Sequence, residues 1–243
     1  MAEKADGLHR SKNIGLGPST VKYSQYVKDC LAHTSYTAVY QIVSKDEADY
    51  TAFELLCTTN KWLHVRRKWL SDGEQKWIAR HSSRNSGDPH GYFYVVYKIH
   101  KSPIKTRPGV SDCASVTNPL SEWVDVMLQP FAELMETYFK DSFELKFITD
   151  QFIVPPGGQL FVIDAKSVYT YFDTGVALLA IAEYLRDDET NRQFSHYRGE
   201  TLISAMEIVM KNGIFRFGGN FSEEQYLQIW RHLRKANLRN CRG

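Results

Sequence analysis

Residues 92–110, YFYVVYKIHKSPIKTRPGV, combine a run of aromatic and β-branched side chains with a cation-rich segment that holds two prolines. The first part, Tyr92–His100, has the composition of a β-strand, because such side chains fill a pleated, half-buried surface. Residues 101–109 are typical of a turn, and residues 110–116 (VSDCASV) are typical of a second extended segment. The stretch therefore predicts two extended segments joined by a basic turn that contains Arg107 and Pro108.

Helical patterns surround this stretch. Capping boxes at Ser44–Glu47 and Ser71–Glu74 predict a helix from 44 to about 69, with Phe53, Leu56 and Leu63 on its inner face, and a short helix after it. Four further helices are predicted over 118–138, 143–152, 174–186 and 199–211, and IFRFGGNF (214–221) is typical of a hairpin. This irregular order of helices and antiparallel strands predicts an α+β fold.

The charge of the chain is unevenly distributed. Its 243 residues carry a formal net charge of +2, but residues 61–107 hold eleven Lys and Arg against three Asp and Glu, whereas residues 108–160 hold two against eight. A basic region beside an acidic one is typical of a polyanion-binding surface next to a metal-binding region, and equally of a solvated surface on a bilobed protein. The scattered cysteines lack the spacing of a zinc site or a disulfide framework and are expected to be buried thiols.

An acid stands where another apolar run ends. The segment LFVIDAKSVYTYFD (160–173) is predicted to begin as a buried strand that places Asp164 at its wet end. Magnesium prefers oxygen ligands and often takes only one or two carboxylates, with substrate phosphates completing its shell. An isolated aspartate at a strand end is more often a helix cap or a turn residue, so the local pattern leaves both interpretations open.

Five collinear segments resemble reverse transcriptases, especially those of Penelope-like retroelements. FVIDAKSVYTYFD is similar to the first catalytic segment of that family, and YVVYKIHKSPIKTRPGVSDCAS resembles its fingers segment. SEWVDVMLQPF (121–131), KNIGLGP (12–18) and the pair ALLAIAEYL and ISAMEIVMKNGIFRFGG resemble flanking family segments, although Ser11 stands where the family has Asp. The resemblance implies the fingers and partial palm of a right-hand polymerase.

The resemblance also implies roles for the residues around Asp164. Asp164 would bind the catalytic Mg²⁺ ions, Ala165 would offer its backbone to the triphosphate, and Tyr169 would exclude a 2′-hydroxyl and so select deoxynucleotides. Without the motif, Tyr169 would be interpreted as a core aromatic. Asp187 and Asp188 lie too soon after Asp164 to be the second acidic segment and are interpreted as a solvated helix end.

The basic residues receive two expected roles. Arg107, with Lys98 or Lys101, would clamp the incoming triphosphate, although Lys101 and Lys105 also suit a solvated turn. Arg66, Arg67 and Lys68 would help to hold the single-stranded template. The tryptophans at 62, 69 and 77 are expected to be core residues in preference to stacking platforms.

The family pattern stops near residue 230. Gln228 matches the next family loop, but residues after 230 do not, and the second segment of paired aspartates is missing. We therefore expect a flexible segment over 1–20, a fingers-like region over 21–158, a partial palm over 159–230 and a divergent basic tail over 231–243. From the end of the partial palm into that tail, a helix is predicted from a capping box at Ser222 and Gln225, with Leu227, Trp230 and Leu233 on one face.

The expected reaction of the family is RNA-templated extension of a DNA primer from dNTPs with Mg²⁺. This chain alone is expected to be inactive and to bind Mg²⁺ weakly, because one carboxylate cannot hold two adjacent dications. The alternatives are a non-catalytic nucleic-acid-binding remnant of a retroelement and a sequence that is never translated. The absence of a signal-peptide core and of a long apolar run predicts an intracellular protein, nuclear or cytoplasmic, without a membrane partner.

Overall fold

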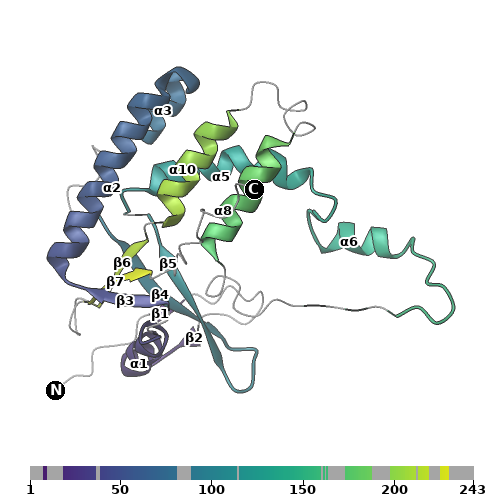
Figure 1. Ribbon diagram of the computed structural model, residues 1–243. Coiled ribbons are helices and arrows are strands. Elements are labelled where there is room, and N and C mark those ends of the chain that lie inside the picture. The colour runs from purple at the N-terminus through teal and green to yellow at the C-terminus, as the bar shows by residue number, and fades with distance from the viewer. Residues whose placement is uncertain are drawn as a thin grey trace, which may run out of the picture.

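The computed structural model places helices and strands in an α+β arrangement, as the sequence predicts (Figure 1). It describes residues 8–9, 19–36, 39–80, 89–113, 115–159, 161, 163, 173–187, 198–211, 213–218 and 225–229. A short pair, β1 (Leu8–His9) and β2 (Ser19–Thr20), lies near the amino end. The larger sheet has five strands in the order β3-β7-β6-β4-β5. Their bounds are β3 Tyr40–Val43, β4 Gly91–Lys98, β5 Lys105–Ser111, β6 Ile214–Phe217 and β7 Gln225–Ile229.

Strand β4 connects the two halves of the sheet. It pairs antiparallel with β5 along its whole length and parallel with β6 at Gly91 and Tyr92. The sheet therefore combines strands from residues 40–111 with strands from residues 214–229, and residues far apart in sequence meet across it. A Cβ on Gly91 would lie 3.0 Å from Val110 and 3.1 Å from the Ser111 carbonyl oxygen, so the junction requires a small residue.

One face of the sheet carries the aromatic core. Side chains alternate between the two faces of a strand, and Phe93, Val95 and Tyr97 of β4 are buried together with Phe215 and Phe217 of β6. The rings of Phe93 and Phe215 stack with centroids 5.5 Å apart. Helix α1 (Tyr23–Thr34) packs on this face and contributes Cys30, which is fully buried. Burial raises the pKa of the Cys30 thiol to about 11, whereas Cys57 and Cys113 are exposed, against the prediction of buried thiols.

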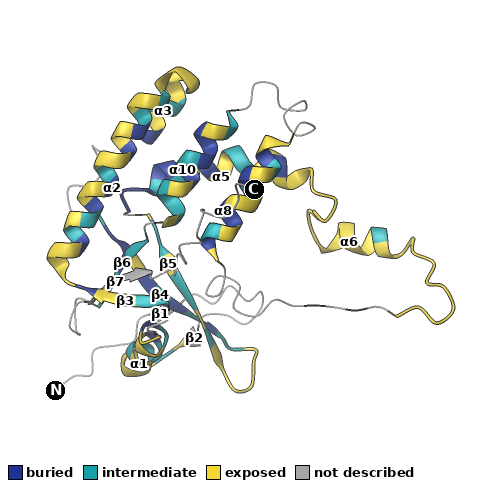
Figure 2. Cartoon of the chain, viewed as in Figure 1, coloured by how far each residue is buried: buried dark blue, intermediate teal, exposed yellow. Residues whose placement is uncertain are grey.

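Four helices build a second core above the sheet (Figure 2). They are α2 (Lys45–Arg66), α5 (Asn118–Glu133), α8 (Thr174–Arg186) and α10 (Gly199–Lys211). The helix α2 continues through a 3₁₀ turn, η1 (Arg67–Trp69), into α3 (Asp72–Ile78). Leu120, Leu185, Leu202 and Met206 are almost fully buried at their centre. The predicted ranges 174–186 and 199–211 match α8 and α10, although Asp173 caps α8 through its side chain.

Glu74 connects α3 to two other helices. One carboxylate oxygen accepts hydrogen bonds from the Ser71 backbone N–H at 2.6 Å and from Arg198 at 3.2 Å, and the other accepts from the Trp123 indole at 2.9 Å. Burial by itself would raise the pKa of Glu74. The hydrogen bonds from Ser71, Trp123 and Arg198 outweigh that effect and hold the pKa below its usual value. The predicted capping box at Ser71 is thus also a tertiary contact.

Two helix predictions need correction. Phe53 is 63% exposed, because α2 buries Ala48, Ala52, Leu55, Thr59 and Trp62 instead, at the 4-3-4-3 spacing of a single helix face. The helix α5 ends at Glu133, not near 138, and Pro130 lies inside it. The predicted helix over 143–152 exists as α6 (Ser142–Thr149), but it stands on an arm away from the body (Figure 1).

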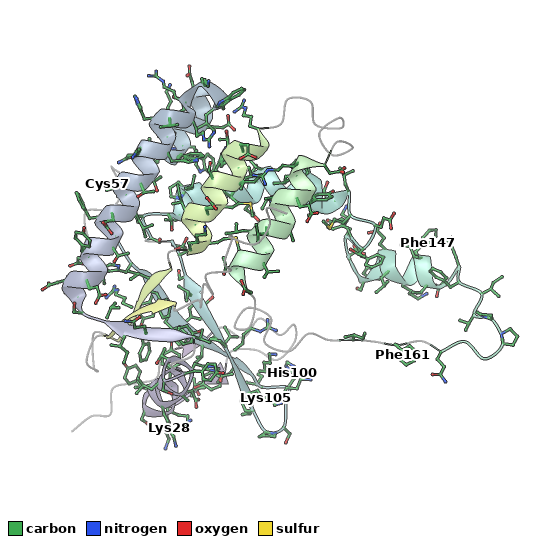
Figure 3. All side chains as sticks on the ribbon, viewed as in Figure 1. Lys28, Cys57, His100, Lys105, Phe147 and Phe161 are labelled. Atoms are coloured by element: carbon green, nitrogen blue, oxygen red, sulfur yellow. The ribbon has the colours of Figure 1, made fainter. Side chains whose placement is uncertain are left out.

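The predicted buried strand before Asp164 is wrong for its two described residues. Phe161 and Ile163 belong to no strand and are 77% and 92% exposed. Figure 3 places Phe161 on the arm that carries α6. A strand needs a neighbouring edge with which to form hydrogen bonds, and an apolar run of this length does not specify one.

The carboxyl-terminal hairpin exists with a different second strand. The strand β6 follows the predicted start, but it pairs with Gln225–Ile229 through contacts such as Phe217↔Gln225, so the loop is longer than Gly218-Gly219-Asn220. The predicted helix around Leu227 is replaced by β7, because these residues lie between β3 and β6 and pair with both. Residues 231–243 lie outside the described residues.

Gly109→Ala should displace the ring of Tyr94. A Cβ at this position would lie 2.8 Å from Cζ of Tyr94, its partner across β4 and β5. We expect Gly109→Ala to lower the free energy of unfolding by about 1–3 kcal/mol, because the ring or the strand must shift. Urea unfolding measures this, with Gly73→Ala in α3 as the control, where a Cβ meets nothing closer than 4.0 Å. An equal effect of both substitutions would contradict the close packing of Tyr94 on Gly109.

The stabilisation by Glu74 should depend on pH. Because its pKa is lowered in the folded chain, the carboxylate stabilises the fold above the unfolded pKa, near 4.3, and this contribution is lost as pH falls through the folded pKa. We expect Glu74→Gln to cost about 1–2 kcal/mol at pH 7, and the difference from the unsubstituted chain to shrink below about pH 4. Urea unfolding across this range, with exposed Glu133→Gln as control, tests it; a difference independent of pH would exclude the charged hydrogen bonds as its source.

Candidate nucleotide and nucleic-acid surface

The face of the sheet opposite the aromatic core carries cationic side chains. The register pairs Lys98 with Lys105 and Val96 with Arg107 across β4 and β5. Directly opposed residues share a face, and residues two apart in a strand also do. Lys98, Lys105 and Arg107 therefore lie together, on the side away from Phe93, Val95 and Tyr97. Arg216 lies on the same face but further along β4, because β6 places it in register with Tyr92, six residues before Lys98. We call these four residues the basic face.

Tyrosine rings separate the cations of the basic face. The Arg216 guanidinium lies over the ring of Tyr92, with its carbon 5.7 Å from the ring centroid. Tyr94, two residues further along β4, covers Gly109 of β5. The absence of a side chain at Gly109 is what allows this close approach. The glycine of the Arg-Pro-Gly sequence therefore has a packing role, which keeps an aromatic ring flat on the sheet beside Arg107.

Like charges oppose each other on this face without a described counter-ion. Lys98 and Lys105 are direct cross-strand partners, an arrangement that destabilises a sheet. Among the residues that the structure describes, no acid forms an ion pair with Lys98, Lys105 or Arg107. A multiply charged anion placed between these side chains would remove the repulsion.

Helix α1 supports the hairpin from the other side. The Tyr97 hydroxyl donates to Asp29 Oδ2 at 2.6 Å, and His33 Nε2 lies 2.8 Å from the Thr106 hydroxyl. Burial raises the pKa of Tyr97, with a further contribution from the bond to Asp29, so the phenol stays protonated and keeps donating. Burial lowers the pKa of His33 below its usual value. These contacts fix both strands and hence the spacing of the cations on the opposite face.

The structure brings together some of the predicted nucleotide-binding residues. Lys98 and Arg107 share the basic face, whereas Lys101 lies in the exposed connection after β4. Arg107 and Pro108 were predicted in a turn, but they belong to β5, where the edge position tolerates a proline. Lys105 was not predicted to bind nucleotide and was interpreted as part of a solvated turn, but it lies on this face as well. Arg216 was not predicted; the alternation in Ile214–Phe217, with phenylalanines at 215 and 217, was the signal that could have found it.

The predicted catalytic residues cannot be compared with this surface. Asp164, Ala165 and Tyr169 lie outside the described residues. The backbone of Gln228 is paired with Gln41 in β3 and Ile214 in β6. Among the described residues, no group of three or more His, Cys, Asp or Glu side chains could hold a metal ion. Asp187 caps the end of α8 and is exposed, as predicted, and Asp188 lies outside the described residues.

The second predicted basic cluster lies at the other end of the molecule. Arg66, Arg67 and Lys68 are at the junction of α2 and η1, whereas the connection between β4 and β5 lies at the opposite end of the structure (Figure 1). Trp62 is buried against Trp123, as expected of a core residue. Trp69 and Trp77 are exposed, so the prediction of core tryptophans is wrong for these two. They lie in η1 and α3, and the residues that directly follow them, Leu70 and Ile78, are buried in the helical core.

The chain matches no protein-family model, no curated protein and no solved structure in comparisons with each of these groups. Within the described part of the chain, no helix combines the length and the apolar character needed to cross a membrane.

Proposed function

We propose that the chain carries the fingers and part of the palm of a polymerase resembling Penelope-like reverse transcriptases, and that its basic face binds the triphosphate of a dNTP. The observation that supports this most is the register of β4 and β5, which sets Lys98 opposite Lys105 and Arg107 two residues along. These cations come from the segment with the family resemblance. Like charges that lie directly opposite each other destabilise a sheet unless a bound anion neutralises them.

The side chains suit a polyphosphate in different ways. The Arg107 guanidinium offers paired N–H donors that match two phosphate oxygens, whereas each lysine supplies a compact positive charge. Because both strands are fixed by α1, the donors are held at a constant spacing before the ligand arrives. Such preorganisation reduces the entropy lost on binding. The ring of Tyr94 beside Arg107 provides an apolar border for the site.

The remaining parts of the proposal follow from the resemblance. Asp164 would hold Mg²⁺, Tyr169 would select the deoxyribose, and an RNA template and a DNA primer would be the other partners. Two-metal phosphoryl transfer needs ligands for both ions, and this sequence holds one of the two acidic segments of the family. We therefore infer that the chain alone does not extend a primer, and Asp164-dependent incorporation of dNTPs in a primer-extension assay would contradict this.

A second candidate function is nucleic-acid binding without catalysis. The exposed cations Arg67 and Lys68 favour it, since neither forms an ion pair with any residue in the described ranges. A polynucleotide would be bound through its phosphates, and its affinity would fall steeply with salt. The two functions differ in what the basic face binds: free dNTP in the first and only polymer in the second.

Removal of Arg107 tests the nucleotide proposal. We expect Arg107→Ala to weaken binding of a fluorescent dNTP by about tenfold or more, because charge-assisted bonds to phosphate are lost. Lys28→Ala is the matched control, since Lys28 is exposed on α1, which covers the opposite face of the sheet (Figure 3). Binding that survives Arg107→Ala and Lys98→Ala, or is lost equally with Lys28→Ala, would overturn the assignment.

A further inference from the structure

Two exposed tryptophans lie at the corner where α2 turns into α3. Trp69 ends η1 and is 47% exposed, and Trp77 lies on α3 and is 44% exposed. Tryptophan side chains are usually well buried, but neither of these belongs to a hydrophobic cluster of the described residues. We call Arg67, Lys68, Trp69, Trp77 and Arg80 the tryptophan corner. It follows the end of α2 that is remote from the sheet, and the 22 residues of that helix span about 33 Å.

Each tryptophan of this corner has a cation over its ring. Lys68 Nζ lies 5.2 Å from the ring centroid of Trp69, and the Arg80 guanidinium carbon lies 5.4 Å from that of Trp77. A cation covers only one side of an indole, and the exposed fractions of the rings leave area for a second planar group. A nucleobase stacked on the ring would bring its phosphate close to the same cation.

The corner is held in a fixed shape. The side-chain amide of Gln75 donates to the carbonyl oxygens of Arg67 at 3.1 Å and Leu70 at 2.9 Å, which ties η1 to α3. Leu70, between η1 and α3, and Ile78, at the end of α3, are both buried in the helical core. Of the acids in α3, Glu74 is directed inward to Trp123 and Arg198, which leaves Asp72 as the exposed carboxylate of that helix. The indoles therefore stand on a rigid base with a cationic surround.

We propose that the tryptophan corner binds single-stranded nucleic acid, by stacking unpaired bases on Trp69 and Trp77 while Arg67, Lys68 and Arg80 contact phosphates. Bases in a duplex are stacked on each other and cannot lie on an indole, so the ligand is a single strand, RNA or DNA. The inference rests on the nucleic-acid-binding part of the proposed function and adds a second contact region, remote from the basic face. The strand would therefore be held at two separate places on the chain.

Binding of labelled oligo(dT), oligo(U) and a DNA duplex, followed by fluorescence anisotropy at several salt concentrations, tests this. We expect Trp69→Ala and Trp77→Ala each to weaken single-strand binding about tenfold, with an unchanged salt slope and unchanged duplex binding. Trp69→Phe should retain most of the affinity, because a phenyl ring still stacks. Lys68→Ala should reduce the salt slope by about 0.7, the value for one phosphate contact on a single strand.

Phe53→Ala is the control, since it removes an exposed aromatic ring from α2, fourteen residues before η1. Full single-strand affinity in Trp69→Ala and Trp77→Ala, or an equal loss with Phe53→Ala, would overturn the inference. If dNTP binding remains sensitive to Arg107→Ala in that case, the proposed function stands without the corner. If neither oligonucleotide binds the unsubstituted chain, the corner and the nucleic-acid part of the proposed function both fail, and equal affinity for duplex would exclude stacking.

Discussion

The aromatic core and the basic face are both positioned by the antiparallel pairing of β4 with β5. Seven consecutive register pairs, from Tyr92↔Ser111 to Lys98↔Lys105, fix which side chains share a face. A slip of one residue would bring the cations into the aromatic core and expose Phe93 and Val95. The burial of those rings against α1 and β6 therefore positions Lys98, Lys105 and Arg107 as firmly as it stabilises the fold.

The helical core positions a second cationic surface, the tryptophan corner. Helix α2 is anchored at both ends, by Val43, Ala48 and Ile214 near the sheet and by Trp62 in the helical core. The tryptophan corner follows its carboxyl end, where Leu70 and Ile78 are buried in the same core and Trp69 and Trp77 are exposed. The tryptophan corner therefore follows the end of α2 that is remote from the sheet, and the sheet carries the basic face. A ligand that contacts both must be a polymer, whereas a nucleotide can contact only one.

The sequence predicted what depends on local pattern. The capping residues at Ser44 and Ser71 and the periodicity of 174–186 and 199–211 were sufficient to locate α2, α3, α8 and α10. The prediction put Phe53 on the buried face because it is apolar and directly follows Ala52, which belongs to that face. The range 225–229 was predicted as part of a helix because Leu227, Trp230 and Leu233 fit a helical spacing, but partners on both sides make it a strand. Such pairing is a property of the whole sheet.

The residue types of the candidate site were predictable from the sequence, and their arrangement was not. The cations Lys98 and Arg107 were identified from their segment, but their common face needed the register, and Arg216 comes from a strand more than a hundred residues away. Trp69 and Trp77 were expected in the core because tryptophan usually is. Only the turn from α2 into α3 decides that their rings face outward. The residue types indicated binding of a polyanion. The pairing of the strands decided which of the cations share a face.

Photo-crosslinking with an azido-substituted dNTP, followed by mass spectrometry of the peptides, shows whether a dNTP binds the basic face. The account predicts labelled residues on the cationic side of the sheet, in 94–98, 105–109 or 214–217, and competition by unmodified dNTP. Labelling confined to α1, which covers the aromatic side, or labelling that unmodified dNTP does not reduce, would contradict it.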